Sequence, residues 1–250
     1  MKVTFLYGRS GSGKTHTIAN HLRRATEDGI HSFLLIPEQQ SHSAERHMLN
    51  LLPPSAQLTV EALSFSRLSN RVFRQYGGLS YRYATSGIRT LLMWRNLCEL
   101  SPMLTQYGEQ AAQNPTLSEL MLSAVNELKG CGISSATLER AAKRLPDGHT
   151  LRTRLNDIAL IYAAYQNALT ERYDDAADDL ARLDEVLEKH DFFKNCHVYI
   201  DYFTSFTARE IAVIRHIFRQ AAHVTIALGC EGRADRSLHL ATVTDTANTL

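Results

Sequence analysis

The sequence predicts an α/β fold in which a parallel sheet carries a phosphate-binding loop (P-loop) and is interrupted by a mostly helical insertion. A glycine-rich motif lies between a strand-like run and a helical run near the N-terminus, at residues 8–15. The pattern is almost entirely helical from about residue 66 to residue 195, and strand-like runs return from residue 197 onward. One α/β domain with a helical insertion is the simplest architecture that accounts for these observations.

The first 66 residues alternate strand-like and helical patterns. "KVTFLY" (2–7) and "SFLLIP" (32–37) are continuous apolar runs of strand length, as expected for strands buried on both faces of a parallel sheet. "QLTVEALS" (57–64) is a weaker third candidate. Between the first two, residues 15–29 carry apolar residues on one helix face and stop at Gly29. Strand, helix and strand in this order predict a βαβ unit.

Residues 66–195 carry the periodicity of successive amphipathic helices. The segment 66–78 ends at two glycines, and the segment 114–132 opens with a capping-box pattern, Thr116 with Glu119. A long helix is predicted over 151–173. The acidic run Asp174, Asp175, Asp178 and Asp179 has the look of a metal cluster, but leucines at helical spacing follow it. We therefore interpret it as the solvated start of a helix.

Two further strand-like runs follow, "HVYIDYF" (197–203) and "HVTIALG" (223–229). They flank a helical segment that opens with a second capping-box pattern, Thr207 with Glu210. The predicted organisation is a discontinuous sheet lobe formed by residues 1–66 and 196–250, with residues 67–195 as the helical insertion.

Composition narrows the class of protein. The 250 residues have a formal net charge of +1, which argues against a strongly basic nucleic-acid binder but permits a basic groove on one face. The four cysteines include no CxxC pair, so a zinc or iron–sulfur site made from this chain alone is not expected. The N-terminus lacks a signal-peptide pattern, and no apolar run is long enough for a membrane span. We expect a reduced, cytoplasmic protein without a membrane partner.

The glycine-rich motif matches the P-loop pattern G-x-x-x-x-G-K-[ST] in full and has the expected strand before it and helix after it. Its glycines allow successive backbone N–H groups to converge on phosphate at a helix N-terminus. The lysine is expected to bridge the β- and γ-phosphates of ATP, and the threonine hydroxyl to bind Mg²⁺. The predicted nucleotide-binding residues are Gly8, Arg9, Ser10, Gly11, Ser12, Gly13, Lys14 and Thr15.

A P-loop site also needs a carboxylate at the end of a neighbouring strand to hold Mg²⁺. Asp201, which closes "HVYID", is the best candidate, and the insertion accounts for its distance from Lys14. A strand-end turn residue is the other interpretation. A hydrolysing motor usually has a glutamate next, but Tyr202 follows here and cannot act as a base near neutral pH. Weak or absent hydrolysis is therefore expected, and no residue is assigned a firm catalytic role.

Four segments occur in an order and at distances that resemble a known family: "FLYGRSGSGKT", "LLIPEQQSHSAER", "ALSFSRLSNRVFRQYGG" and "VYIDYFTSFTARE". The chain resembles the N-terminal part of AddB, the second subunit of AddAB-type ATP-dependent helicase/deoxyribonucleases, over essentially its whole length. The resemblance implies a RecA-like P-loop lobe with a helical insertion, as in superfamily 1 helicases. It also implies that the chain is a fragment of a longer protein.

The resemblance carries further expectations about function. The family's complex resects broken double-stranded DNA, with the AddA-type subunit as the active motor and heterodimer partner. The AddB-type subunit is similar to a helicase that has lost its motor role and kept DNA binding. Its nuclease carboxylates and iron–sulfur cysteines are expected beyond Leu250. Gly8 to Thr15 then corresponds to the Walker A loop and Asp201 to the Walker B position.

Candidate DNA contacts lie after two of the predicted strands. Gln39 and Gln40 follow the second strand, where a helicase has its first strand-contacting motif and where open α/β sheets bind ligands. Arg67, Arg71 and Arg74 share one face of the following helix, and either track a DNA backbone or form a solvated basic face.

Two alternatives remain open at this stage. The chain could be an active DNA-stimulated ATPase, which the missing acid after Asp201 disfavours. It could also be a P-loop phosphotransferase with the insertion as lid, for which Arg82, Arg89 and Arg95 are available but not distinguished.

Overall fold

The computed structural model describes residues 2–40, 46–47, 50–79, 82–111, 114–230, 232 and 246. The chain divides into two compact units. The sheet unit comprises Met1–Leu79 with Leu180–Leu250, and the helical unit comprises Ser80–Asp179.

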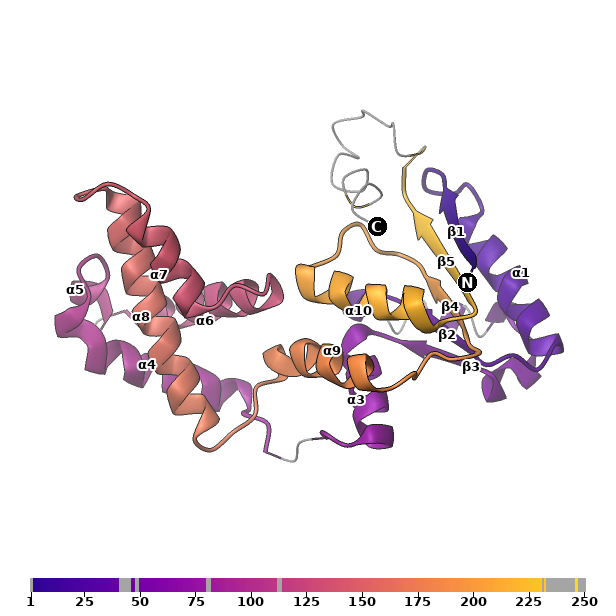
Figure 1. Cartoon of the computed structure of the whole chain (residues 1–250), viewed down its shortest axis with the longest axis horizontal. Helices are drawn as coiled ribbons and strands as arrows, with labels where there is room; N and C mark the ends of the chain where they lie inside the picture. Colours follow the sequence, from indigo (N-terminus) through magenta and orange to yellow (C-terminus); the bar gives the residue numbers. More distant parts are fainter. Residues whose placement is uncertain are drawn as a thin grey trace. The chain divides into compact units, whose positions relative to one another are not determined.

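The sheet unit is built on five parallel strands, in the order β1-β5-β4-β2-β3 (Figure 1). Every adjacent pair is parallel, which confirms the predicted parallel sheet. All five strands therefore end at one common edge, and the loops that leave that edge come from distant parts of the sequence. The strands are β1 (Lys2–Tyr7), β2 (Ser32–Leu35), β3 (Val60–Leu63), β4 (His197–Ile200) and β5 (His223–Leu228).

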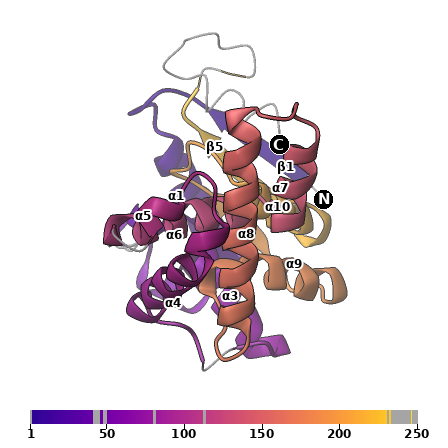
Figure 2. The same ribbon diagram turned by 90° about the vertical axis from the view of Figure 1, so that its left-hand side faces the viewer.

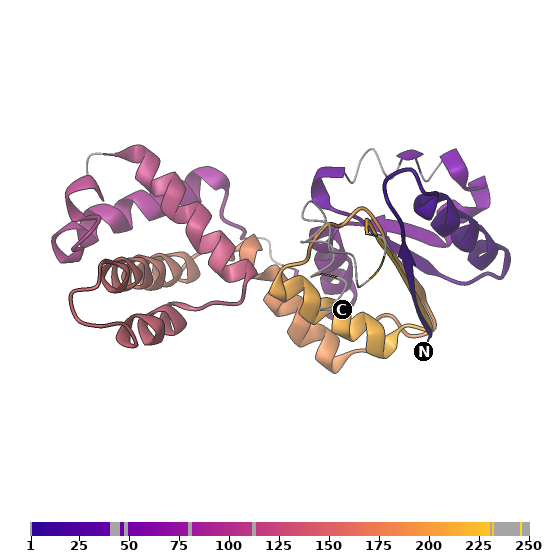
Figure 3. The same ribbon diagram turned by 90° about the horizontal axis from the view of Figure 1, so that it is seen from above.

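Helices cover both faces of the sheet, which is why the strands are apolar throughout. Helix α1 (Lys14–Glu27) packs on one face, where Ile18 and Leu22 contact a cluster that includes Leu34 and Tyr199. The other face is covered by α3 (Phe65–Tyr76), α9 (Asp179–Lys189) and α10 (Ala208–Gln220), as Figure 3 shows. Helix α1 ends as predicted, with Gly29 in the left-handed region at φ 68°.

The boundaries of the units differ from the expected 66/67 and 195/196. Helices α3 and α9 belong to the sheet unit, although both lie in the range 67–195 that the sequence predicts for the insertion. Leu68 and Val72 of α3 and Leu183 and Leu187 of α9 are buried in the same cluster as Val198 of β4. Helical periodicity identifies the apolar face of a helix but does not identify what covers that face. The pattern alone therefore could not show to which unit α3 and α9 belong.

The helical unit, whose helices face the viewer in Figure 2, has its own core. Residues of α4, α6 and α8 fill it, among them Met93, Leu97, Val125, Tyr165 and Leu169. The elements of this unit are α4 (Ser86–Leu100), η3 (Ser101–Met103), α5 (Gly108–Ala111), α6 (Pro115–Gly130), α7 (Ser135–Lys143), α8 (Thr150–Thr170) and η4 (Ala176–Asp178).

One of the two predicted capping boxes is present. At α10 the Thr207 side chain accepts from the Glu210 amide, and the Glu210 carboxylate accepts from the Thr207 amide. At α6 the prediction is wrong, because Asn114 is the N-cap and its side chain accepts from the Thr116 amide. Pro115 takes the first helical position, where its missing N–H is tolerated, and so moves the start of the helix before Thr116.

The acidic run at 174–179 is not a solvated helix start. The Lys129 ammonium lies 2.8 Å from carboxylate oxygens of both Asp175 and Asp178, and its side chain is only 3% exposed. Arg89 lies 3.5 Å from Asp175, and the Tyr83 hydroxyl donates to Asp179. Asp175 and Asp178 are therefore paired with cations that are distant in sequence, and within the described residues the acidic run forms no metal-binding group.

Among the described residues, no helix combines the length and the apolar character needed to cross a lipid bilayer.

Candidate nucleotide-binding site

The loop after β1 has the backbone geometry of an anion-binding turn. Gly11 and Gly13 have φ of 78° and 87°, in the left-handed region that favours glycine, and Gly13 is the N-cap of α1. At Gly8, an added Cβ would lie 2.9 Å from the Ser12 Cβ, so the loop closes too tightly for a side chain there. The unpaired N–H groups at the start of α1 add positive potential. This geometry is suited to binding phosphate.

The Lys14 side chain folds back over this loop. Its ammonium donates to the Gly8 carbonyl at 2.6 Å, to the Arg9 carbonyl at 2.9 Å and to the Ser12 hydroxyl at 3.4 Å. These contacts hold a positive charge at the centre of the loop, within reach of an anion that enters from solvent. The contact of Lys14 with phosphate stays a prediction.

Asp201 meets the P-loop across the carboxyl edge of the sheet. The Thr15 hydroxyl donates to Asp201 Oδ2 at 2.8 Å, across a sequence separation of 186 residues. The other oxygen, Oδ1, accepts from the backbone N–H of Tyr202 at 2.8 Å. The β4 strand and the start of α1 thus bring together the two residues that the sequence assigned to Mg²⁺.

The environment of Asp201 resists ionisation. The residue is 4% exposed, and burial raises the pKa of its carboxyl group. The hydrogen bonds from Thr15 and from the Tyr202 amide, together with the Lys14 charge, act in the opposite direction. A buried carboxylate beside a threonine hydroxyl is a suitable donor set for Mg²⁺, which prefers oxygen ligands and keeps several waters. The residues present therefore fit a magnesium ion held by Thr15 and Asp201.

Tyr202 adopts a backbone conformation that is unusual for its residue type. Its φ is 68°, in the left-handed region, where bulky side chains are strained. Its side chain packs against the cluster of Ile18, Leu22 and Leu34 on the face of the sheet that α1 covers. The phenol therefore lies on the same side of the sheet's carboxyl edge as the P-loop. Burial raises its pKa further above the ordinary value, so the phenol is neutral and cannot act as a general base at neutral pH.

A cavity of about 600 Å³ opens at this point of the edge. Besides the P-loop, Asp201 and Tyr202, it is lined by two histidines, His16 and His47, that the sequence analysis did not single out. His16 directly follows the motif and could have been noticed from its position. His47 could not, because nothing in its local sequence indicates that it lies near the P-loop.

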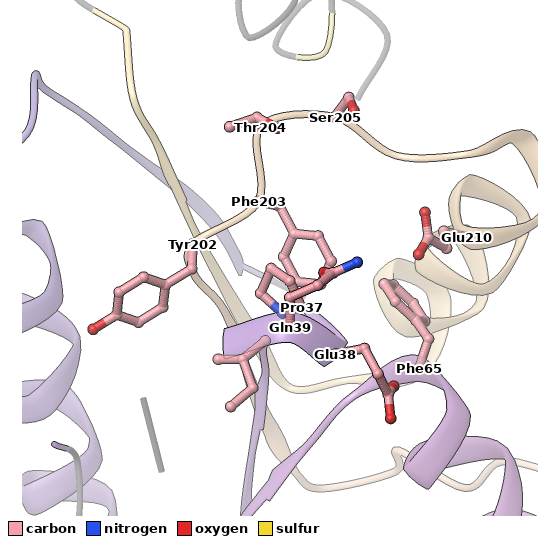
Figure 4. A pocket seen from close by; sticks show the side chains of 10 residues that line it. Pro37, Glu38, Gln39, Phe65, Tyr202, Phe203, Thr204, Ser205 and Glu210 are labelled. Carbon is pink, nitrogen blue, oxygen red and sulfur yellow. The ribbon is translucent and has the colours of Figure 1, made fainter. Parts of the chain in front are cut away.

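A second cavity of about 370 Å³ lies on the other side of the loop that follows Asp201. Figure 4 shows Phe203 pointing toward Phe65 and Gln39, whereas the Tyr202 ring points the opposite way. Gln39, one of the predicted DNA contacts, is exposed and lines this cavity. Tyr202, Phe203 and Thr204 line both cavities, so one short loop separates them.

The sequence of this chain is similar to that of known proteins over the segment that forms the site. The family model described as "ADDB, N-terminal" matches residues 5–248. The chain belongs to this AddB N-terminal family. The matched segment includes the P-loop, both cavities and Asp201, so the site described above lies wholly within the family's N-terminal region.

Similar curated proteins are named as the second (B-type) subunits of ATP-dependent helicase/deoxyribonucleases. One from Caldanaerobacter subterraneus is 30% identical over 237 residues, which is 94% of this chain and 20% of the relative. One from Clostridium tetani is 31% identical over 238 residues, 93% of this chain and 20% of the relative. One from Acetivibrio thermocellus is 29% identical over 228 residues, which is 90% of this chain and again 20% of the relative. The chain thus spans about a fifth of the length of these relatives.

The predicted DNA-contacting arginines lie in unlike surroundings. Arg67 and Arg74 are exposed on α3. Arg71 is engaged, because its guanidinium donates to Glu61 at 3.1 Å and to Gln75 at 3.2 Å. The side chain of Gln40, the remaining predicted contact, lies outside the described residues.

The arginines considered for a phosphotransferase belong to the helical unit. Arg89 donates to the Tyr165 hydroxyl and to Asn126, and Arg95 pairs with Glu99 on the same helix at 2.8 Å. Arg82 is exposed near the start of this unit. Arg89 and Arg95 therefore serve contacts within the helical unit itself.

Proposed function

We propose that this chain is the N-terminal, nucleotide- and DNA-binding helicase-like lobe of an AddB-type subunit of an ATP-dependent helicase/deoxyribonuclease. In this proposal it acts in the cytoplasm, in the resection of double-strand breaks for recombinational repair, together with an AddA-type subunit that supplies the motor. The observation that carries the proposal is the hydrogen bond between Thr15 and Asp201, which joins the P-loop to a carboxylate 186 residues away. Family membership and the names of the relatives support the wider role.

The chain's own residues account for binding of Mg-ATP. The P-loop amides and Lys14 hold the phosphates, while Thr15 and Asp201 provide oxygen ligands for the metal. When bound, the magnesium ion supplies neutralisation of the phosphate charge. Asp201 is already oriented by the Tyr202 amide, so little rearrangement of the carboxylate is needed.

We propose that hydrolysis is weak. The residue after Asp201 is a neutral tyrosine, and Glu210, the nearest downstream acid, is engaged in the capping box of α10. The site therefore has groups to bind a triphosphate but no carboxylate placed next to Asp201 to activate water. An active DNA-stimulated ATPase is the alternative function, and a phosphotransferase is a weaker one because Arg89 and Arg95 are engaged elsewhere.

Nucleotide binding tests the core of this proposal. Mg-ATP titrated calorimetrically into the chain should bind, and Lys14→Ala should weaken binding roughly 100-fold, because a charge-assisted contact to phosphate is lost. Phosphate release, followed with and without single-stranded DNA, should stay at background in both proteins. DNA-stimulated turnover in the wild type would instead support the motor, and phosphate transferred to a nucleoside would support the phosphotransferase. No binding by the wild type would refute the proposal.

DNA binding is tested separately, by fluorescence anisotropy with a labelled single-stranded oligonucleotide. Gln39→Ala should weaken binding about two- to tenfold, as expected for loss of a neutral hydrogen bond. Arg67→Ala and Arg74→Ala should each reduce the slope of log affinity against log salt by about 0.7. Arg140→Ala, an exposed arginine of α7, serves as the control. Equal losses in all four variants would argue against this DNA-binding surface.

A further inference from the structure

The left-handed backbone at Tyr202 is a strained feature next to the nucleotide site. A non-glycine residue held there is strained and persists only where its surroundings impose that conformation. Within the described residues, Tyr202 and Asn195 are the non-glycine residues with positive φ, and asparagine tolerates this region far better than tyrosine. The presence of a tyrosine at this position, where glycine or asparagine would be less strained, therefore needs an explanation.

The tyrosine ring is directed at the magnesium-binding pair. Its side chain lines the same cavity as Thr15 and Asp201, and the Thr15 hydroxyl donates its own proton to Asp201. Tyr202 donates its backbone N–H to the other Asp201 oxygen. Tyr202 thus bonds to Asp201 through its main chain, and its side chain shares the cavity above the P-loop with Thr15 and Asp201.

A phenol in this position has different chemistry from a carboxylate. A neutral tyrosine donates one hydrogen bond and carries no charge that repels phosphate. Donation to a phosphate oxygen is charge-assisted, and is therefore stronger than a hydrogen bond between two neutral groups. The P-loop amides contact phosphates that ATP and ADP share, and Lys14 bridges the β- and γ-phosphates, whereas a donor beside Thr15 and Asp201 is placed at the metal-facing end of the chain of phosphates.

We propose that Tyr202 is a specificity-determining residue that selects a nucleoside triphosphate over a diphosphate. On binding of Mg-ATP, the phenol hydroxyl donates to the terminal phosphate, so the site holds the triphosphate at the place where a hydrolase would activate water. This inference rests on the proposed nucleotide binding and adds the discrimination between ATP and ADP. The left-handed φ is the conformation that directs the ring to the P-loop side of the edge, opposite to Phe203 (Figure 4).

The test compares the affinities of ATP and ADP, each with magnesium, for the 250-residue chain by calorimetry. Tyr202→Phe keeps the ring and its packing and removes only the hydroxyl. It should weaken ATP binding about tenfold and leave ADP binding within about twofold. Tyr199→Phe is the matched control on β4, since Tyr199 is buried and does not line the nucleotide cavity. It should leave both affinities unchanged.

The possible outcomes separate the two proposals. Wild-type binding of ATP that Lys14→Ala strongly weakens, with an unchanged ATP-to-ADP ratio in Tyr202→Phe, would overturn the role of Tyr202 and leave the proposed nucleotide binding intact. Equal losses of ATP and ADP affinity in Tyr202→Phe would also overturn it, because that pattern indicates a general packing role. If the wild type binds neither nucleotide, both proposals fail.

Discussion

At the scale of single residues, Asp201 is a carboxylate at a buried position, where folding alone would favour an uncharged side chain. Asp201 is nearly inaccessible to solvent, and its carboxylate has lost most of its hydration. Two hydrogen bonds and the Lys14 charge compensate only in part, since the net effect is a raised pKa. Such a residue is retained for what it binds rather than for stability.

The variant Asp201→Asn tests whether the buried carboxylate lowers stability while it serves binding. The amide can donate to Thr15 and accept from the Tyr202 amide, so both contacts survive while the buried charge is removed. We expect the free energy of unfolding in urea, without nucleotide, to rise by about 1 kcal/mol. Magnesium-dependent ATP binding should fall sharply in the same variant.

Asp191→Asn, at an exposed aspartate, is the control for a simple change of net charge. A loss of stability in Asp201→Asn would show that the ionised carboxylate stabilises the fold, contrary to this view.

The P-loop could be predicted from sequence because its residues are consecutive and each has a local task. Asp201 was found because a strand pattern ends at it. His16 could have been noticed because it directly follows the motif. The place of His47 in the cavity depends on how distant segments meet and carries no local signal.

At the scale of elements, the amino-terminal ends of β4 and β5 gather histidines on the face covered by α1. The His197 and His223 rings lie 5.4 Å apart, and His21 of α1 lies near Tyr199 of the same strand as His197. Burial lowers the pKa of all three, and the cations Arg24 and Lys2 lower some of them further, while Asp28 opposes the shift at His197. Strand pairing places these residues together, so their grouping was not visible in the sequence.

This cluster predicts sensitivity to acid. Because the folded-state pKa of each histidine lies below 6.5, the unfolded chain binds protons first as pH falls. Stability should therefore be lost as the pH drops below about 6.5. Thermal unfolding followed between about pH 8 and pH 5.5 should show a falling midpoint, and His223→Gln should reduce that fall.

His16→Gln, at an exposed histidine of α1, should keep the wild-type dependence on pH. If His223→Gln behaves in the same way as His16→Gln, the acid sensitivity has another origin.

At the scale of the whole molecule, the fold class could be predicted because it depends on the order of strand-like and helical segments along the chain. It does not depend on which segment packs against which. The parallel sheet and the helical insertion are both confirmed. The placement of α3 and α9 was wrong because several helices in a row look alike until their buried faces find a common core. The acidic run was misjudged for a related reason, since Lys129 lies far from it in sequence.

The position of β1 in the sheet has a consequence for how the protein is made. Within the described residues β1 pairs with β5, the last strand, and Lys2 lies opposite His223. During synthesis the first strand must therefore wait roughly 10 to 45 s for its neighbour to be translated. The helical unit is complete well before that moment, whereas the loop proposed to bind phosphate has no finished sheet behind it. Binding of ATP would therefore require that nearly the entire segment has left the ribosome and that β1 has paired with β5.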